Sequence, residues 1–130
     1  MLARYQEKGG KVLMLEADVS PQEAVKRIRG FVPGSLSLAV AGAPYVLGNV
    51  TRLGTRKALA IHLLNYAAEP VSGIRVRVNL DREFASLAGA QPRLLTPDPR
   101  TSGIAAVRWN GSAIEFALKS LDTYGIVILE

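Results

Sequence analysis

Paired carboxylates are the side chains of this sequence with the clearest chemical use, since two of them can carry out hydrolysis. That chemistry needs two carboxyl groups about 5–9 Å apart, one of them with a raised pKa. Glu16 and Asp18 follow a short apolar stretch, where the loops of α/β folds carry function. The other carboxylates fall on predicted helix surfaces, in loops or on the outward side of a predicted strand. Because the rest of such a fold is missing, we expect no catalytic residue in this chain, and an enzyme built on Glu16 and Asp18 is kept only as an alternative.

His62 is the only histidine, and the sequence contains no cysteine. A histidine cluster or a thiolate site for a metal is thereby excluded. No G-x-S-x-G motif is present that would make His62 the base of a serine hydrolase, and the glycines are too dispersed for a phosphate-binding loop. We therefore expect no metal and no cofactor. We expect His62 to be a hydrogen-bonded interior residue, because buried polar groups are normally paired.

Aromatic side chains offer a second kind of chemistry, the stacking of a flat ring on a sugar. Trp109 is the only tryptophan and lies beside the Asn110-Gly111 dipeptide. Packing in the core is its alternative use, because large aromatic side chains dominate buried area. Together with Tyr66 and Tyr45, Trp109 makes up the candidate carbohydrate-binding set.

The composition is that of a globular protein of 130 residues, long enough for one domain with its own core and a small appendage. Hydrophobic residues make up 48% and charged residues 21%, which excludes a disordered chain. The net charge is +5, but the basic residues are scattered and are not interleaved with stacking aromatics, so we expect no nucleic-acid partner. The weakly polar run from Ser35 to Gly48 is broken by Pro44 and is shorter than the roughly 20 residues of a bilayer span, so we expect no membrane segment.

The stretch from Lys57 to Asp81 has the clearest structural pattern. Apolar and polar residues alternate from Ile74 to Leu80, which predicts a strand with one core face and one solvent face. Ala58 to Tyr66 is apolar on both faces, as is typical of a central strand. Glu69-Pro70 cannot continue a ladder, because proline has no N–H group. We therefore expect a hairpin of two long strands with a loop of several residues between them.

Further strands follow from short apolar runs separated by turn signals, and together they predict a mainly β fold, an antiparallel β-sandwich of about seven or eight strands. Asn110-Gly111 predicts a tight hairpin turn that places Val107 and Trp109 across from Ala113 or Ile114 and their neighbours, because that dipeptide accepts positive φ at both central positions. The strands are expected at Leu36–Val40, Tyr45–Arg52, Ala58–Tyr66, Gly73–Asp81, Arg93–Thr96, Ile104–Trp109, Ala113–Leu118 and Gly125–Leu129.

The N-terminal residues predict a small α/β appendage, so that we expect domains at residues 1–35 and 36–130. Leu2 to Lys8 has the pattern of a helix end, closed by Gly9-Gly10, and Val12 to Leu15 that of a short buried strand. Ser20-Pro21-Gln22-Glu23 predicts a capped helix that ends at Gly30. The N-terminus lacks the apolar segment of a secretory signal, which predicts a cytoplasmic protein if Met1 is the natural start.

Three segments in order carry a resemblance to a known family, AIHLLNYAAEPVSGIRVRVNL, LLTPDP and the closing LDTYGIVILE. From about Tyr45 to Glu130 the chain resembles the C-terminal β-sandwich of large multidomain glycoside hydrolases. These enzymes have a catalytic (β/α)8 barrel and a flavodoxin-like middle domain of the β-galactosidase trimerisation type. LARYQEKGGKVLML is similar to the last helix and strand of that middle domain.

The resemblance implies a non-catalytic accessory domain. The family's catalytic carboxylates lie in the barrel, so no catalytic residue is carried over to this chain. The implied partner is the catalytic domain of the same or a partner chain. The alternatives are a carbohydrate-binding module built on Trp109, Tyr66 and Tyr45, a small free-standing protein, an enzyme built on Glu16 and Asp18, and packing against a second copy of the chain.

Overall fold

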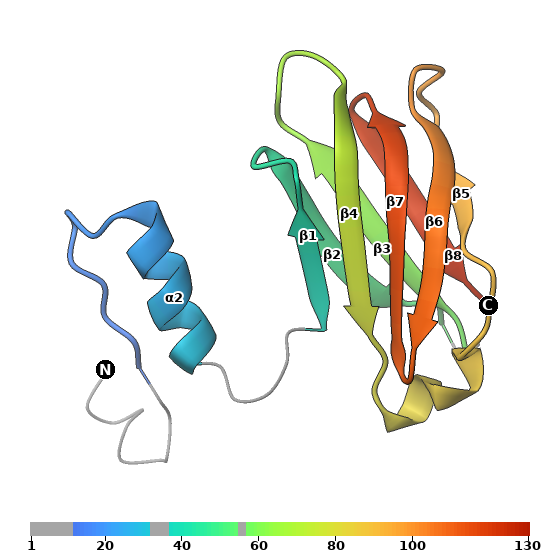
Figure 1. The fold of residues 1–130 in the computed structure, drawn as a ribbon, viewed down its shortest axis with the longest axis horizontal. Coiled ribbons are helices and arrows are strands. Elements are labelled where there is room, and N and C mark those ends of the chain that lie inside the picture. Colours follow the sequence, from blue (N-terminus) through green and yellow to red (C-terminus); the bar gives the residue numbers. More distant parts are fainter. Residues whose placement is uncertain (1–11, 32–36, 55–56) are drawn as a thin grey trace. The chain divides into compact units, whose positions relative to one another are not determined.

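The computed structural model describes residues 12–31, 37–54 and 57–130 (Figure 1). Contacts within the chain divide it into two units, Met1–Ser35 and Leu36–Glu130. No helix in the described part of the chain has the length and apolarity that crossing a membrane requires.

The first unit contains helix α2, Pro21–Phe31. The Glu23 N–H donates to the Ser20 hydroxyl at 3.2 Å, as in a capping box, and the helix therefore begins where the sequence predicts. It continues through Gly30, one residue beyond its expected end. Along the helix Val25 and Ile28 are exposed, so its apolar side has little cover from described residues.

The prediction of a strand over Val12–Leu15 is wrong. Residues 12–16 have no regular secondary structure, and the side chain of Met14 is 77% exposed. A strand needs a neighbour to pair its N–H and C=O groups, and within residues 12–31 no segment supplies one. The helix predicted over Leu2–Lys8 lies outside the described residues.

The second unit is an antiparallel β-sandwich of two four-stranded sheets, which confirms the predicted fold class (Figure 1). The strand order in sheet A is β1-β4-β7-β6 and in sheet B β2-β3-β8-β5. All the neighbouring strands are antiparallel. The strands are β1 Leu38–Ala41, β2 Val46–Arg52, β3 Leu59–Asn65, β4 Val71–Asn79, β5 Arg93–Leu95, β6 Ser102–Asn110, β7 Ala113–Leu121 and β8 Tyr124–Leu129.

The predicted hairpin between β3 and β4 is wrong. Strand β3 pairs with β2 and β8, whereas β4 pairs with β1 and β7. Residues 66–70 carry the chain from one sheet to the other, a step of about 10 Å between packed sheets that five residues can span. Strand β3 is nevertheless central in its sheet, as its apolar sequence predicts.

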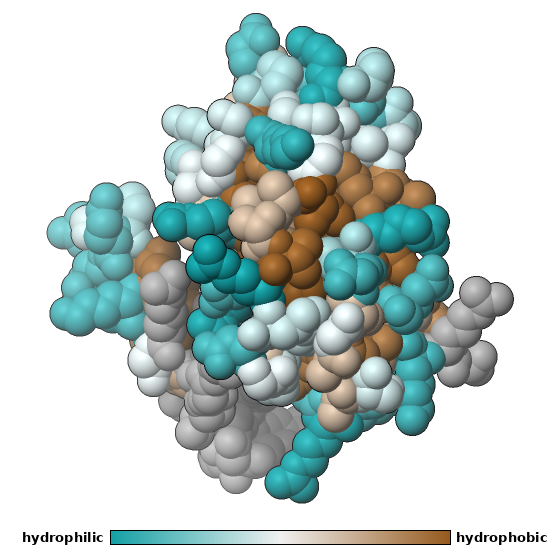
Figure 2. Space-filling view, turned by 45° about the vertical axis from the view of Figure 1, so that its right-hand side comes forward, coloured by the Kyte–Doolittle hydropathy of each residue, from teal (hydrophilic) through white to brown (hydrophobic). Residues whose placement is uncertain are grey.

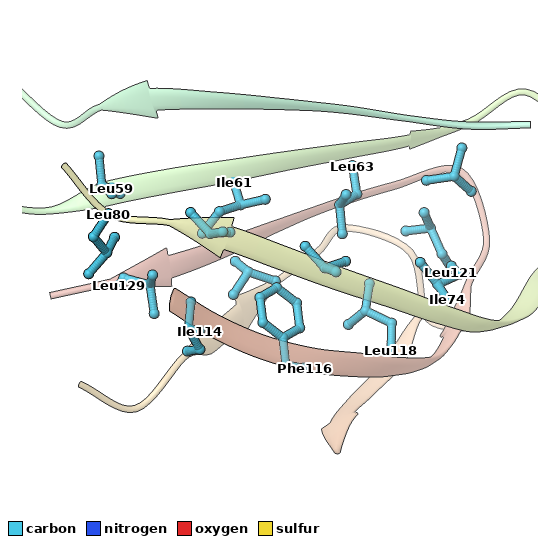
Figure 3. Close-up of a cluster of buried hydrophobic side chains, with 14 of the residues drawn as sticks. Leu59, Ile61, Leu63, Ile74, Leu80, Ile114, Phe116, Leu118, Leu121 and Leu129 are labelled. Carbon is cyan, nitrogen blue, oxygen red and sulfur yellow. The ribbon is translucent and has the colours of Figure 1, made fainter. Parts of the chain in front are cut away.

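The core lies between the two sheets and is filled by alternate residues of each strand (Figure 3). From β4 the buried residues are Ile74, Val76 and Val78, so the predicted alternation of this strand is confirmed. Ile61 of β3 and Phe116 of β7 reach the same space from opposite sheets. Each such side chain contributes about 1.5–3 kcal/mol by leaving water.

A short 3-10 helix, η1 Arg82–Leu87, follows β4 and was not expected from the sequence. Its cap is Asp81, whose carboxylate accepts from the N–H groups of Glu83 and Phe84 at 3.1 and 3.2 Å. Phe84 and Leu87 are buried in the core. The helix therefore covers one end of the sandwich.

Strands β1 and β2 belong to different sheets and approach each other closely at Gly48. A Cβ atom at this position would lie 2.6 Å from Leu38 Cδ2 and 2.9 Å from Val40 Cγ2. Only glycine lets the β1 side chains of sheet A approach β2 of sheet B so closely.

Asn65 fixes the place where the chain leaves β3. Its Nδ2 group donates to the carbonyls of Glu69, Leu121 and Asp122 at 2.9, 3.4 and 2.6 Å. Its Oδ1 accepts from the Ala67 N–H at 2.9 Å. The side chain is only 5% exposed and ties the β3–β4 connection to the β7–β8 turn.

We expect Asn65→Asp to lower the free energy of unfolding by about 2–3 kcal/mol, because a carboxylate in this buried position cannot donate to the three carbonyls that accept from Nδ2. Urea denaturation at neutral pH measures the loss. Asn49→Asp is the matched control, since Asn49 is exposed on β2 and the change there should stay within about 0.5 kcal/mol. Equal stability of the two variants would contradict the role given to Asn65.

The β6–β7 hairpin turns through Gly111 and Ser112, with Asn110 paired to Ala113. The central residues are thus one position later than Asn110-Gly111. Gly111 has a φ of 59° and Ser112 has no positive φ, as in a hairpin turn that needs glycine only at its first central position. Trp109 pairs with Ile114, as predicted, whereas Val107 lies within the register shift between Ala105 and Arg108 and is not paired with a residue of β7.

Strand β6 also contains a bulge between Ala105 and Arg108. Within it Ala106 has a φ of 52°, a left-handed conformation that costs an alanine about 1 kcal/mol.

Ala106→Gly should raise the free energy of unfolding by about 0.5–1 kcal/mol, because the relief of strain exceeds the extra chain entropy of glycine. Ala105→Gly, at the neighbouring position without a positive φ, should lower it by a similar amount. Thermal and urea unfolding of the two variants test this contrast. Destabilisation by both would show that the bulge is unstrained.

Candidate functional site

The candidate pair Glu16 and Asp18 lies in the segment before α2. Glu16 forms an ion pair with Arg27 of α2. Hydrogen bonding from its own backbone N–H, followed by the Arg27 guanidinium, holds the pKa of the Glu16 carboxyl below its usual range. A general acid needs the opposite shift. The structure thus pairs Glu16 with α2 through Arg27, and a catalytic role for Glu16 and Asp18 stays a prediction.

His62 lies on β3, on the side of sheet B that faces away from the core. Its Nε2 is 2.8 Å from the Thr51 hydroxyl, and its Nδ1 is 2.6 Å from the Tyr124 hydroxyl. The rings of His62 and Tyr124 are stacked with their centroids 6.2 Å apart. Both ring nitrogens are thus occupied, and the three side chains link β2, β3 and β8. In residues 12–31, 37–54 and 57–130 no group of three or more histidine, aspartate or glutamate side chains is placed to hold a metal ion.

Around this polar network the outer side of sheet B carries two rows of mainly apolar side chains, beside the polar Asn49 and Thr51 of β2 and Arg93 of β5. Leu47, Leu64 and Tyr124 share one row across β2, β3 and β8, and His62, Ile126 and Leu95 share the next row across β3, β8 and β5. We call this surface the apolar face, and it is extended by Tyr45 and Tyr66. The large hydrophobic side chains that are exposed in the described part of the second unit all lie on it, namely Tyr45, Leu47, Tyr66 and Leu95.

The structure brings Tyr45 and Tyr66 together. The Tyr66 N–H donates to the Tyr45 carbonyl at 2.9 Å and so extends the β2–β3 ladder by one pair. With a period of two, both rings belong to the side of Leu47 and Leu64. The rings are 62% and 66% exposed. They form an accessible aromatic pair at one end of the apolar face.

Trp109 lies apart from the two tyrosines, on β6 of sheet A. It pairs with the buried Ile114, packs against the core and donates from Nε1 to the Ala90 carbonyl at 3.3 Å. Its ring is half-buried between the sheets. Carbohydrate binding by Trp109, Tyr66 and Tyr45 stays a prediction, and a shared site for all three would have to span two sheets.

The outer side of sheet A carries a group of residues that was not predicted as a site. Arg75, Arg77 and Arg108, which are scattered in sequence, line one concavity together with Glu115. Alternation in β4 predicts that Arg75 and Arg77 face solvent, but only the register of β6 on β7 brings Arg108 near them. In the view of Figure 2, apolar surface gathers in the middle of the visible face and hydrophilic residues surround it.

Comparison with known proteins yields one informative likeness. No family model and no curated protein matches the sequence. Among solved structures, alpha-L-fucosidase isoenzyme 2 from Paenibacillus thiaminolyticus is similar, with a TM-score of 0.59 and 14% sequence identity. This likeness shows the fold. It covers 82% of the present chain but only 17% of the fucosidase chain, so the present chain spans a small part of that glycoside hydrolase.

Proposed function

We propose that this chain is a non-catalytic β-sandwich accessory domain of a glycoside hydrolase, and that it docks on the enzyme's catalytic domain in the same polypeptide or in a partner chain. The structural likeness supports this class of protein, because a similar fold occurs there as a small part of a larger glycoside hydrolase. Under this proposal residues 1–35 belong to the end of the domain that precedes the sandwich in the enzyme.

The observation that carries the proposal is the apolar face. Tyr45, Leu47, Tyr66 and Leu95 are 42–66% exposed and gather on one side of one sheet. Exposed apolar side chains that are clustered in this way mark surfaces that another protein covers. Covering them gains about 25 cal/mol for each Å² of apolar surface removed from water.

The polar centre of the apolar face suits docking better than catalysis. His62 is held by Thr51 and Tyr124 and needs no further partner, so a second protein can cover it without leaving a nitrogen unpaired. The same hydrogen bonds hold the three strands in one surface. A rigid surface loses little conformational entropy on association.

Immunoprecipitation of the native protein under non-denaturing conditions tests the docking role. We expect glycosidase activity to be recovered with the wild-type chain, either because it is fused to the catalytic domain or because it binds that domain. For a separate partner, the double variant Leu47→Glu, Leu95→Glu should lose most of this activity, since two charges would be buried without partners. Ser86→Glu, at an exposed position of η1, is the matched control and should retain it.

An immunoblot against the chain separates the two forms of the proposal. A polypeptide several times larger than 130 residues supports the fused form, and mass spectrometry of that band should then identify a (β/α)8 barrel. A native chain of about 130 residues, recovered without glycosidase activity, would overturn both forms.

Carbohydrate binding is the second candidate function, and the pairing of Tyr45 with Tyr66 is the observation that favours it. Two adjacent exposed rings can stack on the faces of a sugar chain. This role uses part of the apolar face and so competes with docking.

A titration with neutral oligosaccharides, followed by amide chemical shifts, tests this second role. Binding should shift the amides of β2 and β3, and Tyr45→Ala or Tyr66→Ala should weaken it by about tenfold, as expected for the loss of one stacked ring. Trp109→Phe should leave the affinity unchanged, because this ring lies in the other sheet. Absence of shifts with every neutral glycan would remove the candidate.

A further inference from the structure

The outer side of sheet A contains an open concavity of about 530 Å³, which is within the size range of small-ligand sites. Its floor includes the methyl groups of Ala39, Ala41, Ala106 and Ala117. It lies on the opposite outer surface of the sandwich from the apolar face, so a ligand here is independent of the docking role.

The shape of the concavity follows from the register of the strands. One row across the sheet is Ala39, Arg77, Glu115 and Arg108. The next row is Ala41, Arg75, Ala117 and Ala105. The long side chains of Arg75, Arg77 and Arg108 form the walls of the concavity. The alanines between them fill little space and leave it hollow.

The charges in the hollow are unbalanced. Three arginines face one glutamate, and Glu115 is bonded to Arg77 at 3.2 Å. The side chains of Arg75 and Arg108 have no hydrogen bond or ion pair with any residue that the structure describes. Two guanidinium groups are thus available to an anion. Guanidinium groups bind carboxylates through two parallel N–H donors.

Arg75 and Arg108 stand on either side of Ala117. Arg75 on β4 is directly across from Ala117, and Arg108 on β6 is across from Glu115, which is two residues along β7 from Ala117. With strands about 4.8 Å apart, the two Cα atoms are about 12 Å apart, a span that two arginine side chains can bridge over the alanine. The bulge at Ala106 lies just before Arg108, and bulges redirect the side chains next to them.

We infer that this concavity binds an acidic saccharide, with a sugar carboxylate held between Arg75 and Arg108 above Ala117. The methyl floor is suited to the C–H face of a sugar ring. The Arg77–Glu115 pair offers both donors and an acceptor to hydroxyl groups. An extended acidic peptide fits less well, because the backbone groups of sheet A are used within the ladder and would leave those of the peptide unpaired.

Titration with trigalacturonate, followed by amide chemical shifts and calorimetry, tests the inference. We expect shifts in β4, β6 and β7 and an affinity that falls with added salt. The double variant Arg75→Gln, Arg108→Gln should weaken binding about tenfold or more, since charge-assisted hydrogen bonds are lost. Ala117→Leu, which keeps the charge and fills the floor, should weaken it by about as much. Arg82→Gln is the matched control, because Arg82 is an exposed residue of η1 away from this face, and it should bind as the wild type does.

Three results would overturn the inference. The first is the absence of shifts in sheet A at millimolar trigalacturonate. The second is equal binding of the neutral trigalactose at the same amides. The third is equal binding of triglutamate together with unchanged affinity in Ala117→Leu, which would indicate attraction of any anion to a basic surface. None of these results depends on whether the apolar face docks on a catalytic domain.

Discussion

Apolar packing between the two sheets is the interaction on which the rest of the structure depends. Successive side chains of a strand point to opposite faces of its sheet. Where an apolar residue faces the core, its two neighbours in the strand therefore face an outer surface. Ile61 from sheet B and Phe116 from sheet A fill the same space, and a shift of either strand by one residue would turn its apolar side chains to solvent. Asn65 completes this arrangement at the crossing between the sheets, where backbone groups leave the ladder and need other partners.

The inner faces of the two sheets pack against each other, so only their outer surfaces are open to other molecules. These two outer surfaces differ in chemistry. Sheet B presents leucine and tyrosine around an internally bonded histidine, a surface that gains by being covered. Sheet A presents arginine above alanine, a basic surface whose unpaired guanidinium groups could meet an anion. One small domain can thus be held by a large partner on one side and meet a soluble ligand on the other.

The sequence predicts local periodicity well and long-range pairing poorly. The alternation from Ile74 to Leu80 is confirmed because it reflects which side of a strand is buried. The hairpin between β3 and β4 is wrong because a loop containing Glu69-Pro70 has the same composition whether the chain returns to its own sheet or crosses to the other. Helix η1 could have been found, since Asp81 before Arg82-Glu83 is a cap signal. The nearness of Tyr45 to Tyr66, and of Arg108 to Arg77, depends on register, which no local pattern contains.

The outermost strands of both sheets have a consequence for how the protein can self-associate. Among these, strands β1 and β5 have only four and three residues, and β6 is bulged. Short, bulged or covered edges are poor templates for the addition of a foreign strand. Strands β1, β5 and β6 are therefore poor starting points for continuous intermolecular sheets, even though nearly half of the sequence is hydrophobic.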